Sequence, residues 1–230
     1  MKQVINEKLI NRNKKIGNIL TIIGVVILVG GLILNLRPDP TRTLLSLVAL
    51  IIGFIVAQIS SYFVSRFARN PRFDEIIADN LTKLNNDYTF YVYASPVPML
   101  LTGPHGVWIP IPITAGGEIY YDGKWKQRGG NFFLKLFGQE SLGKPERDIV
   151  TRENQVRDFL KENFDDGQMP PINSILVSLH PKASIGNIED APTPIAEVDA
   201  LRRTIRRIDR KRDTIVSQET LDEINSLIKS

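Results

Sequence analysis

Side chains that exchange a proton near neutral pH or act as thiol nucleophiles are rare in this chain of 230 residues. The histidines are His105 and His180, and cysteine is absent. An imidazole can exchange a proton near neutral pH, but neither histidine has a carboxylate or a second ligand close to it in sequence. His105 stands in a Pro-His-Gly turn, and His180 precedes a proline at the end of a predicted strand. We therefore interpret both as structural residues.

Other catalytic patterns are also missing. The absence of cysteine excludes thiol nucleophiles, Cys-based metal sites and redox motifs, and a cytoplasmic domain needs no disulfides. The serines do not stand in a nucleophile elbow, and there is no Walker or dinucleotide-binding motif. The pair Gly129-Gly130 alone does not predict a phosphate-binding loop.

The densest charged feature is a run of basic residues near the C-terminus, on a helix predicted over residues 196–212. Their i, i+4 spacing places them opposite Leu201, Ile205 and Ile208. Three interpretations compete: a solvated face paired with acidic neighbours, contact with anionic lipid, and contact with nucleic-acid phosphates. The candidate lipid or phosphate contacts are Arg202, Arg203, Arg206, Arg207 and Arg210.

Two apolar segments, residues 16–36 and 43–65, contain no Lys, Arg, Asp or Glu. About 20 helical residues span the roughly 30 Å hydrocarbon core of a bilayer. The six residues 37–42 between the segments are polar and include two prolines, so the sequence predicts an antiparallel transmembrane hairpin over residues 16–67. A cleaved signal peptide is the competing interpretation, but it would have a shorter apolar region and a small-residue cleavage site.

The charges that flank the hairpin predict its orientation. Residues 1–15 form a basic segment with five lysines or arginines, and three arginines follow the second span. Because basic flanks stay on the cytoplasmic side, we expect an integral membrane protein with both termini in the cytoplasm. Residues 1–72 carry ten basic and two acidic residues, whereas the remaining 158 residues carry 19 basic and 23 acidic residues. The net positive charge of the chain therefore belongs to the anchor.

Small residues recur along both spans. Gly17, Gly24 and Gly31 are seven residues apart on the first, and Ala49, Gly53 and Ala57 are four apart on the second. Such faces allow helices to approach closely in lipid. They could serve either the hairpin itself or a homodimer through the transmembrane helices. Since neither span contains a charge, we interpret the hairpin as an anchor and not as a transport path.

The remainder of the chain predicts one α/β domain over residues 70–215, followed by a C-terminal helix or tail over residues 216–230. Pro110 and Pro112 cannot donate to a β-ladder, so their amide positions should face an edge or a bulge. Residues 126–147 and 181–194 are expected to be loops. Helices are expected at 73–86, 148–163, 196–212 and 218–228, and strands at 88–94, 97–102, 106–114, around 120–125, and 172–179.

The chain resembles the NERD (nuclease-related) domain, a branch of the PD-(D/E)xK nuclease-like superfamily, over residues 73–210. The resemblance rests on the order and spacing of several short matches. They are the leading helix with Glu75, the sequence GPHGVW at 103–108, Gly117-x-Ile119 followed by Trp125, Gln155 in the next helix, the strand at 172–179, and residues 198–201. It implies a restriction-endonuclease-like α/β fold.

In that superfamily, an Asp on one strand and an acidic-x-Lys motif on the next hold Mg²⁺ and activate water. Here the corresponding positions fall near Pro98 or Met99 and within residues 110–113, and residues 88–117 contain no Asp, Glu, Lys or Arg. The nuclease site should therefore be inactive, with no metal or other cofactor bound.

A displaced site is the alternative. Asp122-Gly123-Lys124 has the acidic-x-Lys spacing, and Glu118 and Glu75 could join it; Mg²⁺ would then be the cofactor. The competing interpretation is that Asp122-Gly123 is a hairpin turn with Lys124 in solvent.

We expect a membrane-anchored protein whose NERD-like domain acts as a non-catalytic binding or scaffolding module. Its partners would be the lipid bilayer and either nucleic acid or another protein. A membrane-tethered Mg²⁺-dependent nuclease is the first alternative. A membrane-surface interaction protein with no nucleic-acid role is the second.

Overall fold

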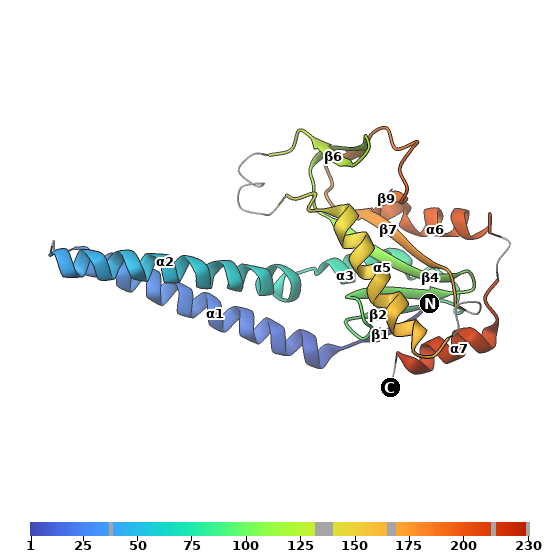
Figure 1. The fold of residues 1–230 in the computed structure, drawn as a ribbon, viewed down its shortest axis with the longest axis horizontal. Coiled ribbons are helices and arrows are strands. Elements are labelled where there is room, and N and C mark those ends of the chain that lie inside the picture. The colour runs from blue at the N-terminus through green and yellow to red at the C-terminus, as the bar shows by residue number, and fades with distance from the viewer. Residues whose placement is uncertain (37–38, 132–139, 165–168, 213–214, 229–230) are drawn as a thin grey trace. The chain divides into compact units, whose positions relative to one another are not determined.

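The computed structural model describes residues 1–36, 39–131, 140–164, 169–212 and 215–228. The chain forms two compact units, the hairpin Asn6–Arg72 and an α/β unit made of Met1–Ile5 and Phe73–Ser230. The protein is thus a mixed α/β protein with two apolar helices near its N-terminus (Figure 1).

The hairpin consists of α1 (Glu7–Leu34) and α2 (Pro40–Phe63), which continues as a π-helical turn over Val64–Ala68. Both helices are long and apolar enough to cross a membrane. α1 begins nine residues before the expected position, because the side chain of Asn6 caps it by accepting a hydrogen bond from Leu9 N at 3.0 Å. Asp39 caps α2, and Pro40 occupies its first turn. Of the expected turn, residues 37–38 lie outside the described residues.

The two helices pack through their small residues. Gly17, Gly24 and Gly31 are the buried glycines of α1, and Ser46, Gly53 and Ser60 are buried on α2, again seven apart. Hydroxyl groups join the helices: Ser46 Oγ donates to Gly31 O at 2.7 Å, and Ser60 Oγ donates to Gly17 O at 3.1 Å. The glycine face of α1 therefore serves the packing of the hairpin. Large apolar side chains point outward along both helices.

The α/β unit contains a six-stranded mixed sheet in the order β1-β2-β3-β4-β7-β9. β2, β3 and β4 are antiparallel neighbours, whereas β1 pairs with β2, β7 with β4, and β9 with β7 in parallel. The strands are β1 (Lys2–Ile5), β2 (Thr89–Val92), β3 (Met99–Gly103), β4 (Gly106–Ile113), β7 (Ile172–Ser178) and β9 (Ile195–Glu197). A second sheet, β6-β5-β8, consists of β5 (Gly117–Tyr121), β6 (Trp125–Arg128) and β8 (Ala183–Ile185).

β1 was not expected. The structure divides the basic segment predicted over residues 1–15 between this edge strand and the first turns of α1. Val4 packs against the core of the α/β unit and is register partner to Tyr91 of β2. In sequence, the hairpin is therefore inserted between the edge strand β1 and the rest of the α/β unit.

Helices cover both faces of the large sheet. α5 (Pro145–Lys161) and α7 (Gln218–Leu227) pack on the face that carries Tyr91, Leu100 and Val107. α3 (Phe73–Leu81) and α6 (Leu201–Asp209), which contact each other, belong to the face that carries Trp108. In Figure 1, α5 lies in front of β4 and β7.

The prolines of β4 face the side of β3 beyond the end of the paired ladder, so they disrupt no pairing, as expected. Val107 N donates to Pro171 O at 2.8 Å, on the β7 side. Because amide groups alternate along a strand, those of residues 109, 111 and 113 also face β7, and positions 110 and 112 face β3. The described ladder between β3 and β4 ends at Leu101 and Trp108, so neither proline interrupts it.

Three expectations for the C-terminal half need correction. Part of the loop expected at 181–194 is β8, which pairs with β5. Residues 196–197 belong to β9 and not to a helix, because they pair with β7. The predicted helix is instead α6, which follows a 3₁₀ turn and ends at Asp209 and not at residue 212. β6 extends to Arg128 inside the loop expected at 126–147, and residues 132–139 of that loop lie outside the described residues.

Candidate functional site

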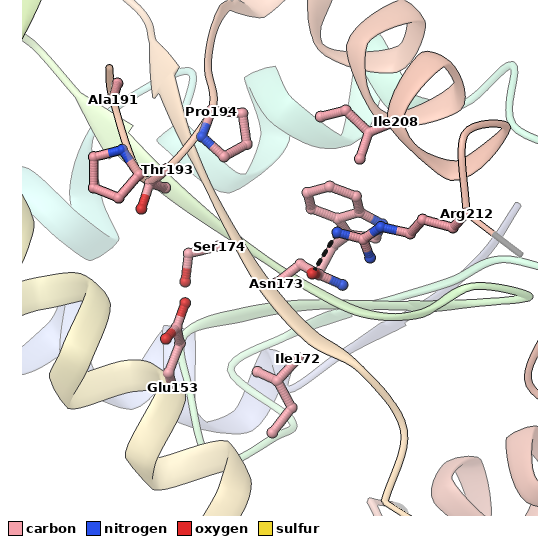
Figure 2. A pocket seen from close by; sticks show the side chains of 11 residues that line it. Glu153, Ile172, Asn173, Ser174, Ala191, Thr193, Pro194, Ile208 and Arg212 are labelled. Atoms are coloured by element: carbon pink, nitrogen blue, oxygen red, sulfur yellow. Dashed lines mark hydrogen bonds between the residues drawn. The ribbon is translucent and has the colours of Figure 1, made fainter. Parts of the chain in front are cut away.

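A pocket of about 370 Å³ opens at the start of β7 (Figure 2). Its walls come from β4, α5, β7, the segment that leads into β9, and the C-terminal end of α6. The lining residues are Trp108, Glu153, Ile172, Asn173, Ser174, Ala191, Pro192, Thr193, Pro194, Ile208 and Arg212.

The position of the pocket follows from Pro194. Leu176 N donates to Pro194 O at 2.9 Å, and the pairing of β7 with β9 begins at Leu176. Continuing this parallel ladder would require the amide of residue 194 to donate to the carbonyl of Ser174. Proline has no N–H group, so the ladder stops and the first residues of β7 form an open edge.

One wall of the pocket is a fixed guanidinium group. The Arg212 guanidinium lies over the Trp108 ring, 5.2 Å from its centroid, and its Nη2 donates to Asn173 Oδ1 at 2.6 Å. Its Nη1 is buried and has no hydrogen-bond partner among the described residues. A buried donor without a partner costs roughly 1–3 kcal/mol, so this atom is suited to bind an acceptor from a ligand.

Asp209 fixes the indole on which Arg212 rests. Its carboxylate is 3% exposed and accepts from Trp108 Nε1 at 3.1 Å and from the Tyr88 hydroxyl at 2.8 Å. Burial and the hydrogen bond to Asp209 raise the pKa of Tyr88 above its usual value, so its hydroxyl remains a donor. This network connects α6 to β2 and β4 behind the pocket.

The opposite wall supplies acceptors. Ser174 is 4% exposed, and its Oγ has no hydrogen-bond partner in the part of the chain that the structure describes. Figure 2 shows the Glu153 carboxylate, which comes from α5, facing the Ser174 hydroxyl. Since Ser174 and Asn173 are successive residues of β7, their side chains lie on opposite faces of the sheet, and the pocket reaches around its edge.

No histidine is among the described residues that line the pocket. Ser174 Oγ has no hydrogen bond to a base within the described residues, and both histidines lie elsewhere. His105 is in the β3–β4 turn. His180 lies 3.2 Å from Glu140 through Nε2, and its Nδ1 accepts from Lys182 N at 3.1 Å, so both of its ring nitrogens are engaged.

The fallback nuclease residues lie apart. Asp122 and Lys124 are exposed in the β5–β6 turn of the small sheet, where Asp122 pairs with Lys126 and not with Lys124. This hydrogen bond lowers the pKa of Asp122. Glu75 is half-buried on α3, which Figure 1 shows well separated from β6. No group of three or more His, Cys, Asp or Glu side chains within the described ranges could hold a metal ion.

The predicted basic face is present on α6. Arg203, Arg207 and Arg210 are exposed, and Arg202 and Arg206 are half-buried. Arg206 Nη2 donates to Lys83 O at 3.1 Å, so this side chain also links α6 to the segment after α3.

Sequence reasoning missed the pocket because its residues come from five separate segments. Two signals were available. Pro192 and Pro194 flank a single residue just before a strand, which predicts an interrupted ladder. Asp209 lies four residues after Ile205 and eight after Leu201, on the apolar face of α6, which predicts a buried carboxylate with partners.

No family model, curated protein or solved structure matches this chain.

Proposed function

We propose that this protein is a membrane-anchored module whose cytoplasmic, NERD-like α/β domain binds a ligand and has no nuclease activity. The observation that carries the binding role is the pocket beside β7, whose walls hold two buried polar atoms, Ser174 Oγ and Arg212 Nη1, that have no hydrogen-bond partner among the described residues. Binding a polar ligand would satisfy both.

The outward apolar side chains of α1 and α2 support the membrane anchor. The pairing of β1 with β2 supports an even number of crossings, because both ends of the hairpin lead into one sheet. Lys8, Arg12, Lys14 and Lys15 are exposed at the start of α1, which favours a cytoplasmic location for that end.

Two features support a NERD-like domain of restriction-endonuclease-like fold without catalysis. The elements α3, β3, β4, β5, β6, α5 and β7 carry the matched segments in the order that the resemblance implies. The strands that would carry the acidic-x-Lys motif are buried and contain no acidic or basic side chain. A metal held by carboxylates would have no ligand there.

Extraction and cleavage assays on the full chain test this proposal. The protein should stay in the membrane fraction after alkaline carbonate and require detergent for release. Purified in detergent, it should leave single- and double-stranded DNA and RNA intact with Mg²⁺ or Mn²⁺. Metal-dependent cleavage that is lost in both Asp122→Ala and Lys124→Ala would establish the tethered nuclease instead.

A further inference from the structure

We propose that the open edge of β7 binds an extended peptide segment of a partner protein as an added strand, and that this segment has an acidic and a basic residue next to each other. The acidic side chain contacts Arg212 on one face of the sheet, and the basic side chain contacts Glu153 on the other. This ligand class rests on the proposed binding function. It follows from the backbone groups and the charges around the start of β7.

The pocket can pass around only one edge of β7. β4 pairs with the whole strand, from Val107 opposite Ile172 to Ile113 opposite Ser178, so that edge is closed. β9 covers the other edge only from Leu176 onward. Since side chains from both faces of the sheet line the pocket, the pocket lies along the uncovered part of this second edge.

The uncovered edge presents backbone donors and acceptors. Leu176 N donates to Pro194 O, toward β9. Because amide directions alternate along a strand, the N–H and C=O groups of Ile172 and Ser174 face the same side. Neither residue makes a backbone hydrogen bond on that side within the described residues. Unpaired groups at a sheet edge are a template for a further strand, which binds through main-chain hydrogen bonds.

The two faces of the sheet favour opposite charges on successive residues of the peptide, because side chains of a strand alternate between the faces. On the face of Trp108, Arg212 Nη1 is a buried donor without a hydrogen-bond partner among the described residues, which favours a carboxylate. On the other face, the buried hydroxyl of Ser174 and the carboxylate of Glu153 are acceptors, which favours an ammonium or guanidinium group (Figure 2). The two charged residues of the peptide are therefore adjacent.

The remaining lining indicates a short segment with apolar flanks. The pocket volume of about 370 Å³ lies at the small end of the roughly 300–1,000 Å³ range of ligand pockets. Ile172, Ala191 and Ile208 supply aliphatic surface beside the polar groups. Valine is favoured in strands, so a charged pair between two valines suits this lining.

Calorimetry on the full-length protein in detergent tests the proposal with blocked tetrapeptides of one composition. Acetyl-Val-Glu-Lys-Val-amide or acetyl-Val-Lys-Glu-Val-amide should bind, since the two orders serve a strand that runs parallel or antiparallel to β7. Acetyl-Glu-Val-Lys-Val-amide places both charges on one face, so it should bind about tenfold or more weakly than the better of the first two. Equal binding of this spaced peptide, or no binding by either peptide with adjacent charges, would overturn the proposal.

N-methylation of the better peptide separates an added strand from side-chain contacts alone. Successive amides of a paired strand face opposite sides, so methylation of the Glu amide and of the Lys amide should have different effects. One methylated form should bind about tenfold more weakly, and the other should bind as the parent peptide does. Equal affinities of the two methylated forms would contradict the added strand.

Two pairs of variants assign the side-chain contacts. Glu153→Gln and Arg212→Gln should each weaken binding of the better peptide about tenfold or more. Their matched controls, Glu162→Gln at the end of the same helix and Arg210→Gln at the end of α6, should bind as the unmodified protein does. Binding unchanged in either pocket variant would overturn the assignment.

Inorganic phosphate distinguishes failure of this proposal from failure of the proposed function. Phosphate that binds the unmodified protein but not Arg212→Gln, with no binding by any of the peptides, would remove the strand ligand and leave the binding role of the pocket in place. The carbonate-extraction and cleavage results do not depend on any of these titrations.

Discussion

Replacing Gly24 by leucine should open the hairpin, whereas the same change at Gly30 should not. A Cβ atom at Gly24 would lie 3.4 Å from Val56 Cγ1 and 3.7 and 3.9 Å from the backbone N and Cα of Ala57. A Cβ at Gly30 meets nothing within 4 Å. Both variants add the same apolar volume to the same helix, so Gly30→Leu is a matched control.

The size of the effect follows from the contacts at Gly24. Carbon atoms pack roughly 3.5–4.0 Å apart, so the Cβ alone fills the available space and the three further carbons of leucine do not fit. The helices would have to separate by roughly 2 Å, toward the 8–10 Å interaxial distance usual for larger side chains. The hydrogen bonds of Ser60 with Thr21 and Gly17 would be lost, at about 0.6 kcal/mol each and at most about 1.7.

A cysteine pair can report this separation, because the chain has no cysteine of its own. Thr21 and Ser60 lie on facing helices with their hydroxyl oxygens 2.6 Å apart. In the variant Thr21→Cys/Ser60→Cys, oxidation in native membranes should form an intramolecular disulfide, measured as protection from a maleimide polymer. A disulfide needs Cβ atoms about 3.5–4.5 Å apart, so a further 2 Å of separation should slow its formation.

Adding Gly24→Leu should slow formation of this disulfide about tenfold, the factor that corresponds to 1.4 kcal/mol, and adding Gly30→Leu should leave it unchanged. The reasoning is refuted if Gly24→Leu forms the bond as fast as the parent variant. Disulfide-linked dimers as the main product would show instead that the glycine face joins two copies of the chain.

Three further predictions concern the α/β unit. Val4→Asp should lower the free energy of unfolding by about 2–3 kcal/mol, because it brings a charge to the core. Its control, Gln3→Asp on the exposed side of β1, should change this free energy by about 0.5 kcal/mol or less. Thermal unfolding in detergent compares the two variants. Asp209→Ala should cost about 2–4 kcal/mol, since it leaves two buried donors without an acceptor, and Asp209→Asn should cost less; tryptophan fluorescence during denaturation measures both. Burial raises the pKa of Tyr91 to about 12 and also raises the pKa of Tyr88. The stability that their neutral hydroxyls contribute is therefore complete below a pH of about 10, and it is lost as the pH rises toward 12. Absorbance at the tyrosinate band should therefore show two of the six tyrosines ionising only as the domain unfolds, and ionisation of all six near pH 10 in folded protein would contradict this.

The sequence predicts elements that are long or strongly patterned. The apolar spans, the β3–β4 hairpin at Gly103–Gly106, the β5–β6 turn and β7 are confirmed, because hydrophobicity, turn residues and β-branched runs are local signals. β1, β8 and β9 have three or four residues each and form through pairing with distant partners, which no local pattern indicates.

The candidate site was even less predictable, for a related reason. Arg212 belongs by sequence to the basic run on α6, but it lies beyond the last turn of the helix and turns onto Trp108, which is distant in the chain. Ser174 stands within an apolar strand, where a hydroxyl gives no signal of its own. Their roles depend on where the ladder between β7 and β9 begins, and that is a property of tertiary pairing.

The pairing of β1 with β2 also sets the order of events during synthesis. β1 leaves the ribosome first, but its partner follows more than 80 residues later, after both helices of the hairpin. The sheet therefore cannot be completed until the hairpin has been made, and for the membrane-anchored protein that we propose, until both ends of the hairpin lie on one side of the bilayer. Under that proposal, a hairpin that inserted with a single crossing would separate β1 from β2, so pairing of this edge strand would require correct membrane insertion.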